Sequence, residues 1–310
     1  MKPPVLVTRR LPDEVLEHLG ERCDVTLFEE DRPIPRERLL AEAKGKHAIL
    51  PMLTDRVDAE VLDAAGPDLR VVANYAVGYD NVDVAAASER GIVVANTPDV
   101  LTAAVAELTL GLVLALLRRI AEGDRLIRRG GAWELAPTFM LGRGLAGRRL
   151  GVVGWGRIGR EVGRLAEAYG MRVVWTRRSG GGVPLDELLR EADVVSVHTP
   201  LTEETRHLIA ARELALMRPH AVLVNTSRGP VVDEAALVAA LREGRLGGAA
   251  LDVFEREPEV PAELVALENV VLTPHVGSAT VEAREAMGML CVDALRAVLL
   301  EGRRPANALD

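Results

Sequence analysis

The stretch that decides the fold is residues 150–159, which read Leu-Gly-Val-Val-Gly-Trp-Gly-Arg-Ile-Gly. A short apolar run ends there in a Gly-x-Gly-x-x-Gly turn, and a helix-like segment and a second β-rich run (171–176) follow. This order of strand, turn, helix and strand predicts a dinucleotide-binding turn. Gly154 would allow the tight turn, Gly156 would let a pyrophosphate approach the backbone, and Gly159 would let helix and strand pack closely. The phosphates would meet the unpaired N–H groups at the positive end of the helix dipole.

The composition is that of a globular chain. With 310 residues, two domains are the natural expectation, and 48% hydrophobic against 27% charged residues allows a sizeable core. A net charge of −8 and a pI near 5.5 argue against nucleic acid or an anionic membrane as the main partner. Cys23 and Cys291 form no CxxC pair or His/Cys cluster, which argues against a disulfide framework and a metal site and favours a reducing, cytoplasmic setting. We expect neither a signal peptide nor a membrane span.

Short β-rich runs alternate with helical patterns on both sides of the glycine turn, which predicts parallel sheets with helices on both faces. The class is therefore α/β, and a last helix, about 279–300, would return the chain to the first domain. Residues 130–147 are loop-like, either an arm reaching a partner subunit or a surface loop. The further strands expected are 5–8, 24–28, 47–50, 70–74, 92–95, 192–197, 221–225, 248–253 and 270–273, and the helices after the turn include 186–191, 204–210 and 234–243.

The residues after the second strand of the glycine motif indicate which dinucleotide binds. An NAD-preferring fold places an acidic residue there to bind the ribose 2′-OH. This chain instead has Thr176, Arg177, Arg178 and Ser179, without a carboxylate. Arginine pairs with phosphate bidentately, so the turn favours a 2′-phosphate and predicts NADP(H) over NAD(H).

Three residues at expected strand ends could act on a carbonyl substrate. Arg228 follows one strand, Glu257 lies in the loop after the next, and His275 ends the last strand. Open α/β sheets bind ligands at this edge, so a cation, a carboxylate and a proton donor would meet there. Each residue alone also fits a structural role.

Several ordered motifs resemble the D-2-hydroxyacid dehydrogenases, and the resemblance covers nearly the whole chain. Within that family, residues 96–102 and the arginine pair at 177–178 look most like the glyoxylate/hydroxypyruvate reductases. The motifs that carry the resemblance are 154–159, 225–237, 250–258, 273–280 and 76–83.

The resemblance implies roles for these residues. Arg228 matches the arginine that binds the carboxylate and carbonyl oxygen of a 2-oxoacid, and His275 matches the acid/base that protonates the carbonyl oxygen. Glu257 matches the carboxylate paired with that histidine. A neighbouring negative charge favours the protonated form of the histidine. Val77 and Gly78 match a loop whose N–H groups hold the substrate carboxylate. Leu53, after the third strand, either lines the substrate pocket or belongs to the core.

The resemblance also implies two Rossmann-like or flavodoxin-like domains. Residues 1–98 plus 286–310 would form a discontinuous substrate domain, and 99–285 an inserted coenzyme domain, with hinges near 98 and 285 and a homodimer joined through the coenzyme domains. Asp252 matches a residue near the nicotinamide carboxamide. The full set expected to bind the cofactor is Gly154, Trp155, Gly156, Arg157, Ile158, Gly159, Thr176, Arg177, Arg178, Ser179, Thr102, Pro200, Thr226, Ser227, Asp252 and Gly277.

The expected function is NADPH-dependent reduction of a small 2-oxoacid, glyoxylate to glycolate or hydroxypyruvate to D-glycerate. One alternative is another D-2-hydroxyacid dehydrogenase, of the D-lactate or phosphoglycerate type. A second alternative is a dinucleotide-sensing scaffold like the transcriptional corepressors that resemble this family. Such scaffolds usually carry disordered tails, which the composition of this chain does not suggest.

Overall fold

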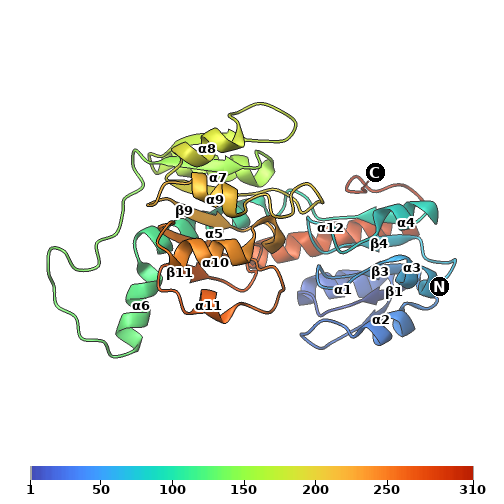
Figure 1. Cartoon of the computed structure of the whole chain (residues 1–310). Helices are drawn as coiled ribbons and strands as arrows, with labels where there is room; N and C mark the ends of the chain where they lie inside the picture. Colours follow the sequence, from blue (N-terminus) through green and yellow to red (C-terminus); the bar gives the residue numbers. More distant parts are fainter. Residues whose placement is uncertain (1, 310) are drawn as a thin grey trace. The chain divides into compact units, whose positions relative to one another are not determined.

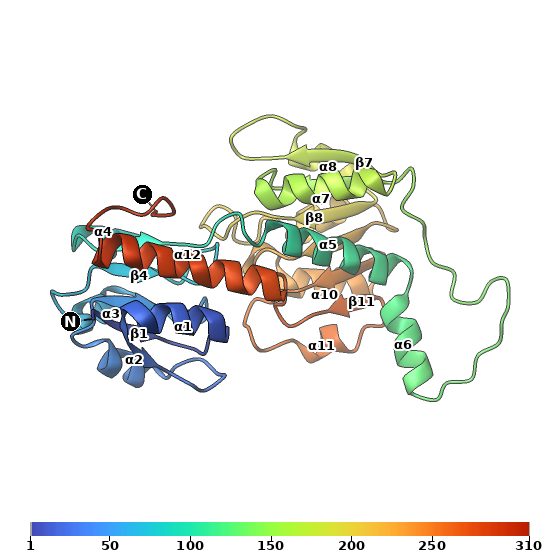
Figure 2. The same ribbon diagram turned by 180° about the vertical axis from the view of Figure 1, so that it is seen from behind.

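Short apolar strands pair in parallel to build two sheets in residues 2–309, the part of the chain that the computed structural model describes (Figures 1 and 2). Each sheet belongs to its own unit. The first unit holds the described residues up to Leu101 and those from Ala279 onward, and the second is Thr102–Ser278. The α/β class with parallel sheets is therefore confirmed. The substrate and coenzyme roles of the units, with their boundaries at 98/99 and 285/286, stay predictions.

The first unit has five strands in the order β2-β1-β3-β4-β5. One face of this sheet, with Leu6 and Ile49, packs on the helices α2 to α4, and α1 and α12 lie side by side in Figure 2. The elements are β1 (Pro4–Val7), α1 (Asp13–Arg22), β2 (Asp24–Leu27), α2 (Arg36–Ala43), β3 (Ala48–Leu50), α3 (Ala59–Ala65), β4 (Val71–Ala73), α4 (Val84–Glu89), β5 (Val93–Ala95) and α12 (Val281–Leu299).

The second unit has six strands in the order β11-β10-β9-β8-β6-β7, so the chain reverses direction across the sheet between β6 and β8. Open α/β sheets bind ligands at such a switch point. The elements are α5 (Thr102–Leu117), α6 (Ile120–Arg128), β6 (Arg149–Val153), α7 (Arg157–Ala168), β7 (Arg172–Thr176), α8 (Leu185–Glu191), β8 (Val194–Val197), α9 (Ala211–Leu216), β9 (Val222–Asn225), the 3₁₀ turn η1 (Gly229–Val231), α10 (Glu234–Arg242), β10 (Gly248–Leu251), α11 (Ala262–Val265) and β11 (Val270–Leu272).

Alternate residues of these strands face opposite layers, as the pleat of a strand requires. Val152 packs with α5 and α7, whereas the next residue, Val153, packs with α8, α9 and α10. The inner strands β8, β9 and β10 are buried on both faces, which explains why their sequences are continuous apolar runs. None of the described helices is both long and apolar enough to cross a membrane.

The prediction of a helix over residues 204–210 is wrong. Turns occupy this segment, and the helix α9 begins only at Ala211. Threonine side chains explain the difference, because Thr205 Oγ1 accepts a hydrogen bond from the Thr202 N–H (2.7 Å) and donates one to the Pro200 carbonyl (2.6 Å). Such local bonds compete with helix formation. His207 also has a φ of 51°, outside the right-handed helical region.

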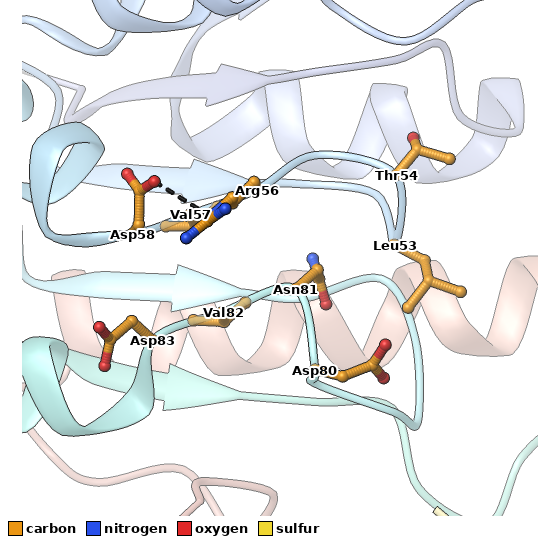
Figure 3. Close-up of a pocket in the computed structure, with 9 residues that line it drawn as sticks. All are labelled: Leu53, Thr54, Arg56, Val57, Asp58, Asp80, Asn81, Val82 and Asp83. Atoms are coloured by element: carbon orange, nitrogen blue, oxygen red, sulfur yellow. Dashed lines mark ion pairs between the residues drawn. The ribbon is translucent and has the colours of Figure 1, made fainter. Parts of the chain in front are cut away.

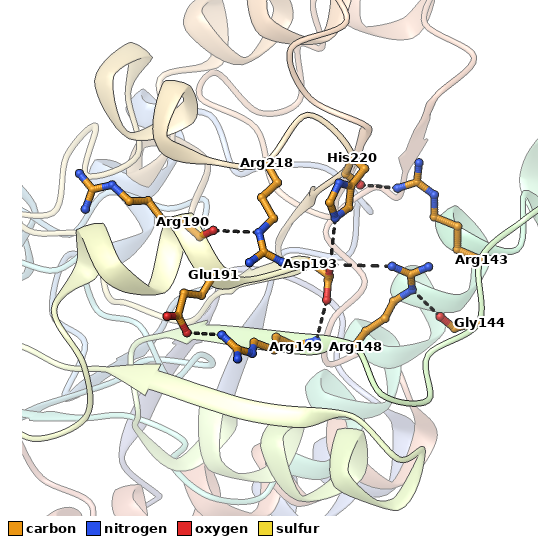
Figure 4. A network of polar contacts seen from close by, with 9 residues as sticks. All are labelled: Arg143, Gly144, Arg148, Arg149, Arg190, Glu191, Asp193, Arg218 and His220. Atoms are coloured by element: carbon orange, nitrogen blue, oxygen red, sulfur yellow. Dashed lines mark hydrogen bonds and ion pairs between the residues drawn. The ribbon is translucent and has the colours of Figure 1, made fainter.

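A polar network joins the amino ends of β6, β8 and β9 (Figure 4). Its centre is the Asp193 carboxylate, which accepts hydrogen bonds from the Arg149 N–H (2.9 Å) and from His220 Nε2 (3.0 Å). Arg148 and Arg218 each bring a guanidinium nitrogen to 3.8 Å from the same carboxylate. This network lies at the edge of the sheet opposite to the glycine turn and ties the strand starts together.

Candidate active site

The glycine turn links β6 to α7 as the motif predicts. Gly154 has a φ of 102°, and a Cβ on it would lie 2.6 Å from the carbonyl oxygen of His198. A Cβ on Gly159 would lie 2.2 Å from the carbonyl oxygen of Gly154, whereas one on Gly156 would meet nothing within 4 Å. The first and third glycines are therefore required by packing inside the protein, and the space over Gly156 is open to a ligand.

Other groups around this turn also fit a dinucleotide. The Thr199 hydroxyl, just after β8, is buried and has no hydrogen-bond partner within residues 2–309. Thr226 Oγ1 lies 2.9 Å from Thr109 Oγ1, and the Ser227 N–H donates to Asn225 Oδ1 (3.0 Å). The twelve-residue helix α7 begins at Arg157, so its first N–H groups face the turn. An orphaned hydroxyl and a helix N-terminus beside open space suit the phosphates of a nucleotide.

The loops after β10 and β11 bring together an acid and a histidine. His275 Nδ1 lies 2.7 Å from Glu257 Oε2, and the Phe254 N–H donates to Glu257 Oε1 (3.0 Å). Both side chains are about one-third exposed, at 33% and 32%. Burial raises the pKa of the Glu257 carboxyl, but the hydrogen bond from His275 and the charges of His275 and Arg228 outweigh it, and that pKa lies below its usual value. The carboxylate is thus ionised at neutral pH.

Asp252 holds the turn that carries His275. Its buried carboxylate accepts hydrogen bonds from Thr273 Oγ1 (2.6 Å), the Val276 N–H (2.9 Å) and the Gly277 N–H (2.8 Å). The Asp252 carbonyl also accepts the N–H of His275 (2.8 Å). His275 has a φ of 52°, a left-handed conformation that needs such support in a residue with a side chain. The sequence reasoning missed this anchoring, and the expected contact of Asp252 with the cofactor stays a prediction.

Arg228 follows β9 and lies close to the loop that carries Glu257. The two loops touch, because a Cβ on Gly229 would lie 2.0 Å from the Phe254 backbone. Asn225 Nδ2 donates to the Arg228 carbonyl (2.9 Å), and the Arg228 guanidinium donates to the Ser227 carbonyl (2.9 Å). The structure therefore brings Arg228, Glu257 and His275 to one edge of the second sheet.

Val77 and Gly78 belong to the first unit, in the loop after β4. Asn96 Nδ2 donates to the Val77 carbonyl (2.8 Å), and Asn74 Nδ2 donates to the Gly78 carbonyl (2.9 Å). The N–H groups of Val77 and Gly78 donate no hydrogen bond within the described part of the chain. Two adjacent donors in a fixed loop can bind an anion. Sequence reasoning missed Asn74 and Asn96 as supports, although each directly follows a strand.

Leu53 lies in the loop after β3, where it lines a pocket of the first unit and does not belong to the buried core (Figure 3). In that view Leu53 and Asp80 lie at one end of the pocket, and Asp58 and Asp83 lie at the other. The pocket is lined by Leu53, Thr54, Arg56, Val57, Asp58, Asp80, Asn81, Val82 and Asp83.

The remaining cofactor candidates lie in the second unit. Arg177, Arg178 and Ser179 directly follow β7, and Thr102 begins α5. Pro200 is exposed in the segment after β8. Across residues 2–309, no group of three or more histidine, cysteine or acidic side chains is arranged to hold a metal ion.

A family model described as the D-isomer specific 2-hydroxyacid dehydrogenase NAD-binding domain matches residues 110–277. The glyoxylate reductase of Thermococcus onnurineus (strain NA1) is 48% identical over 306 residues, which cover 94% of this chain and 91% of the relative. The glyoxylate reductase of Aeropyrum pernix is 47% identical over 324 residues, covering 100% and 96%.

Solved structures agree with this similarity. The TT0316 protein of Thermus thermophilus superposes with a TM-score of 0.94 at 48% identity, covering 99% of this chain and 100% of that one. An NADPH-dependent glyoxylate/hydroxypyruvate reductase of Sinorhizobium meliloti, in complex with NADP and malonate, superposes with a TM-score of 0.85 at 37% identity. That match covers 100% of this chain and 97% of the relative.

Proposed function

This chain belongs to the D-isomer specific 2-hydroxyacid dehydrogenase family, and we propose that it uses NADPH to reduce small 2-oxoacids, glyoxylate to glycolate and hydroxypyruvate to D-glycerate. Membership makes the chain an NAD(P)-dependent oxidoreductase. The observation that carries the proposed reaction is the 2.7 Å contact between His275 and Glu257, with Arg228 at the same sheet edge. The relatives named above as glyoxylate reductases support the substrate class.

In the proposed mechanism, each of the three side chains has one task. The Arg228 guanidinium pairs with the carboxylate of the oxoacid and polarises its carbonyl oxygen. Because His275 Nδ1 is bonded to Glu257, Nε2 is the nitrogen that faces the substrate and gives its proton to the carbonyl oxygen. The ionised Glu257 stabilises the protonated ring before the transfer. When bound, the reduced nicotinamide supplies the hydride that the carbonyl carbon accepts, so that the product is a hydroxyl group.

The first unit contributes to substrate binding in this proposal. The two N–H groups of Val77 and Gly78 would bind a carboxylate oxygen, because the flanking asparagine amides hold that loop by its carbonyls. Leu53 would contact the remainder of the substrate.

For the coenzyme we propose NADP(H) over NAD(H). Arg177, Arg178 and Ser179 offer two cations and a hydroxyl where NAD-binding folds have a carboxylate. The S. meliloti relative described above is an NADPH-dependent enzyme in complex with NADP. The rest of the expected cofactor set, from the glycine turn to Thr102, Pro200, Thr226, Ser227, Asp252 and Gly277, is proposed to complete the site.

We also propose a homodimer joined through the second unit, in a cytoplasmic setting. Residues 130–141 expose large apolar side chains, among them Leu135 at 95% and Trp133 at 54%. Such a patch on one segment typically marks a protein contact. Sedimentation of the wild type and of Leu135→Asp tests this proposal, since a dimer in the wild type that dissociates in the variant is expected. A monomeric wild type would contradict it.

The reaction is tested by comparing kcat/KM for glyoxylate, hydroxypyruvate, pyruvate and phenylpyruvate, each with NADPH and NADH. The proposal expects the highest values for glyoxylate and hydroxypyruvate with NADPH. A clear preference for pyruvate or phenylpyruvate would point to another dehydrogenase of the family. Equal values with NADH would refute the coenzyme preference.

A further inference from the structure

Two tryptophans and an arginine form a stack beside the glycine turn. Trp155 lies inside the Gly-x-Gly-x-x-Gly motif and stacks on Trp175 of β7, with ring centroids 5.2 Å apart and planes inclined by 9°. The Arg177 guanidinium lies over the Trp175 ring, 5.7 Å from its centroid, and Arg177 Nε donates to the Gly180 carbonyl (2.8 Å). Cation–π stacking and this hydrogen bond together fix the plane of the guanidinium. The Trp175 ring and the Gly180 carbonyl thus hold the Arg177 side chain in place.

Arg178, the next residue, is held by a carboxylate. Its guanidinium donates to Glu204 and forms an ion pair with it. The side chains are 78% and 68% exposed, so the pair is formed in water and exchanges readily for another partner.

Glu204 belongs to the threonine-rich turn that replaces the expected helix. Hydrogen bonds between Thr202 and Thr205 hold this turn, and Thr202 Oγ1 lies 3.4 Å from Glu204 Oε2. The turn, rather than a helix, therefore places the Glu204 carboxylate beside Arg178 at the end of β7.

The two arginines would therefore bind a 2′-phosphate in different ways. The terminal nitrogens of Arg177 make no hydrogen bond or ion pair within residues 2–309 and can receive the phosphate directly. Arg178 must first release Glu204, whose negative charge then remains close to the phosphate. Both effects oppose binding of the 2′-phosphate and leave a ligand without that group unaffected.

We propose that Glu204 is a specificity-determining residue that limits the preference for 2′-phosphorylated dinucleotides, while Arg177 on its tryptophan stack is the main phosphate ligand. This inference rests on the proposed coenzyme site. It adds Glu204 to that site, and the negative charge of Glu204 weakens the binding of the preferred coenzyme, NADP(H).

Calorimetric titration with two adenosine nucleotides that lack the nicotinamide tests the inference without any turnover. Adenosine 2′,5′-bisphosphate carries the 2′-phosphate, and 5′-AMP does not. In Glu204→Gln the Kd for the bisphosphate should fall about threefold or more at low salt, the size expected from removing one nearby charge, and the gain should shrink at high salt. The Kd for 5′-AMP should stay unchanged. Glu203→Gln, the adjacent exposed carboxylate, is the matched control and should change neither.

A double-mutant cycle separates the two arginines. Arg178→Gln should weaken bisphosphate binding little in the wild type, where Glu204 occupies Arg178, and more in the Glu204→Gln background. Arg177→Gln should weaken it by about tenfold or more in both backgrounds.

The outcomes distinguish this inference from the proposal beneath it. If Arg177→Gln abolishes the preference for the bisphosphate but Glu204→Gln leaves its Kd unchanged, the role of Glu204 is refuted and the coenzyme site stands. If the wild type binds both nucleotides equally and no variant changes this, both proposals fall. Reductase activity with an oxoacid bears on neither result.

Discussion

Nδ1 of His275 lies 2.7 Å from Oε2 of Glu257, although the two residues come from loops after different strands, β11 and β10. The contact depends on Asp252, whose carboxylate binds three groups of the His275 turn, and on the Phe254 N–H, which fixes the other oxygen of Glu257. It occupies Nδ1 and leaves Nε2 as the ring nitrogen for the proposed proton transfer. The proposed proton transfer follows from this arrangement.

Replacing Glu257 with glutamine removes the charge beside His275 and keeps the side-chain shape. We expect kcat/KM for oxoacid reduction to fall about 100-fold. Steady-state kinetics at neutral pH measure this effect. Glu259→Gln, an exposed acid of the same loop, serves as the control, and a Glu257→Gln variant with the wild-type kcat/KM would count against the pairing.

Replacing Arg228 with glutamine removes the proposed carboxylate ligand. We expect kcat/KM for glyoxylate to fall about 100-fold, since hydrogen bonds to charged groups contribute about 1.5–3 kcal/mol each. Lysine should restore only part of this loss, because it lacks the planar fork of the guanidinium. Titration with NADP+ should give an unchanged Kd. A coenzyme Kd that rises by the same factor would place Arg228 in the coenzyme site instead.

Asp193 contributes stability that depends on pH. Burial raises the pKa of its carboxyl, but the Arg149 N–H, the hydrogen bond from His220 and the charges of Arg148 and His220 outweigh it and lower that pKa. The contribution is therefore complete above the unfolded pKa of about 3.9 and is lost as pH falls through the lower folded value. We expect Asp193→Asn to lower the free energy of unfolding in urea by about 1–3 kcal/mol at pH 7 and by less at about pH 3.5.

The control for Asp193 is Glu191→Gln in the same network, whose exposed pair with Arg149 should contribute less than about 1 kcal/mol. If the two variants lose equal stability, or if the loss in Asp193→Asn is the same at both pH values, the ionised carboxylate does not hold the strand starts together.

His198, at the carboxyl end of β8, should make the apoprotein less stable in mild acid. Burial lowers its pKa from 6.5 to about 4, while its Nε2 lies 2.7 Å from Ser196 Oγ. The unfolded chain binds a proton at this residue below about pH 6.5 and the folded chain does so only near pH 4, so stability is lost as pH falls between these values. The loss at pH 5 is about 2 kcal/mol.

Urea denaturation of wild type and His198→Gln at about pH 7.5 and about pH 5 measures this effect. The variant should show a smaller loss of stability between the two pH values than the wild type does. Equal losses in the two proteins would show that His198 is not the residue responsible.

Local patterns predicted the strands well because most of them bury an apolar run on both faces of a sheet, although the edge strands β2 and β7 are only partly buried. The same patterns failed at residues 204–210, where the side chains of Thr202 and Thr205 bind the backbone of the turn. The glycine motif could be interpreted from spacing alone, because Gly154 and Gly159 are fixed by contacts within their own unit.

The supports of the site could not be predicted in the same way. The roles of Asn74 and Asn96 depend on which carbonyls their amides reach, and that of Asp252 depends on the turn that follows the neighbouring strand. The contacts of Asn96 and Asp252 join residues 19 and 24 positions apart in sequence. The ion pair between Arg178 and Glu204 is likewise visible only once β7 and the turn after β8 are placed together.

The most direct test of the central claim is the rate of NADPH oxidation with glyoxylate in the wild type and in His275→Gln, with the Kd for NADPH measured on the same preparations. The account predicts that kcat falls by about 10²- to 10⁴-fold, the contribution typical of a general acid, while the Kd changes less than about twofold. Equal rates in the two proteins would contradict it, because His275 would then not supply the proton.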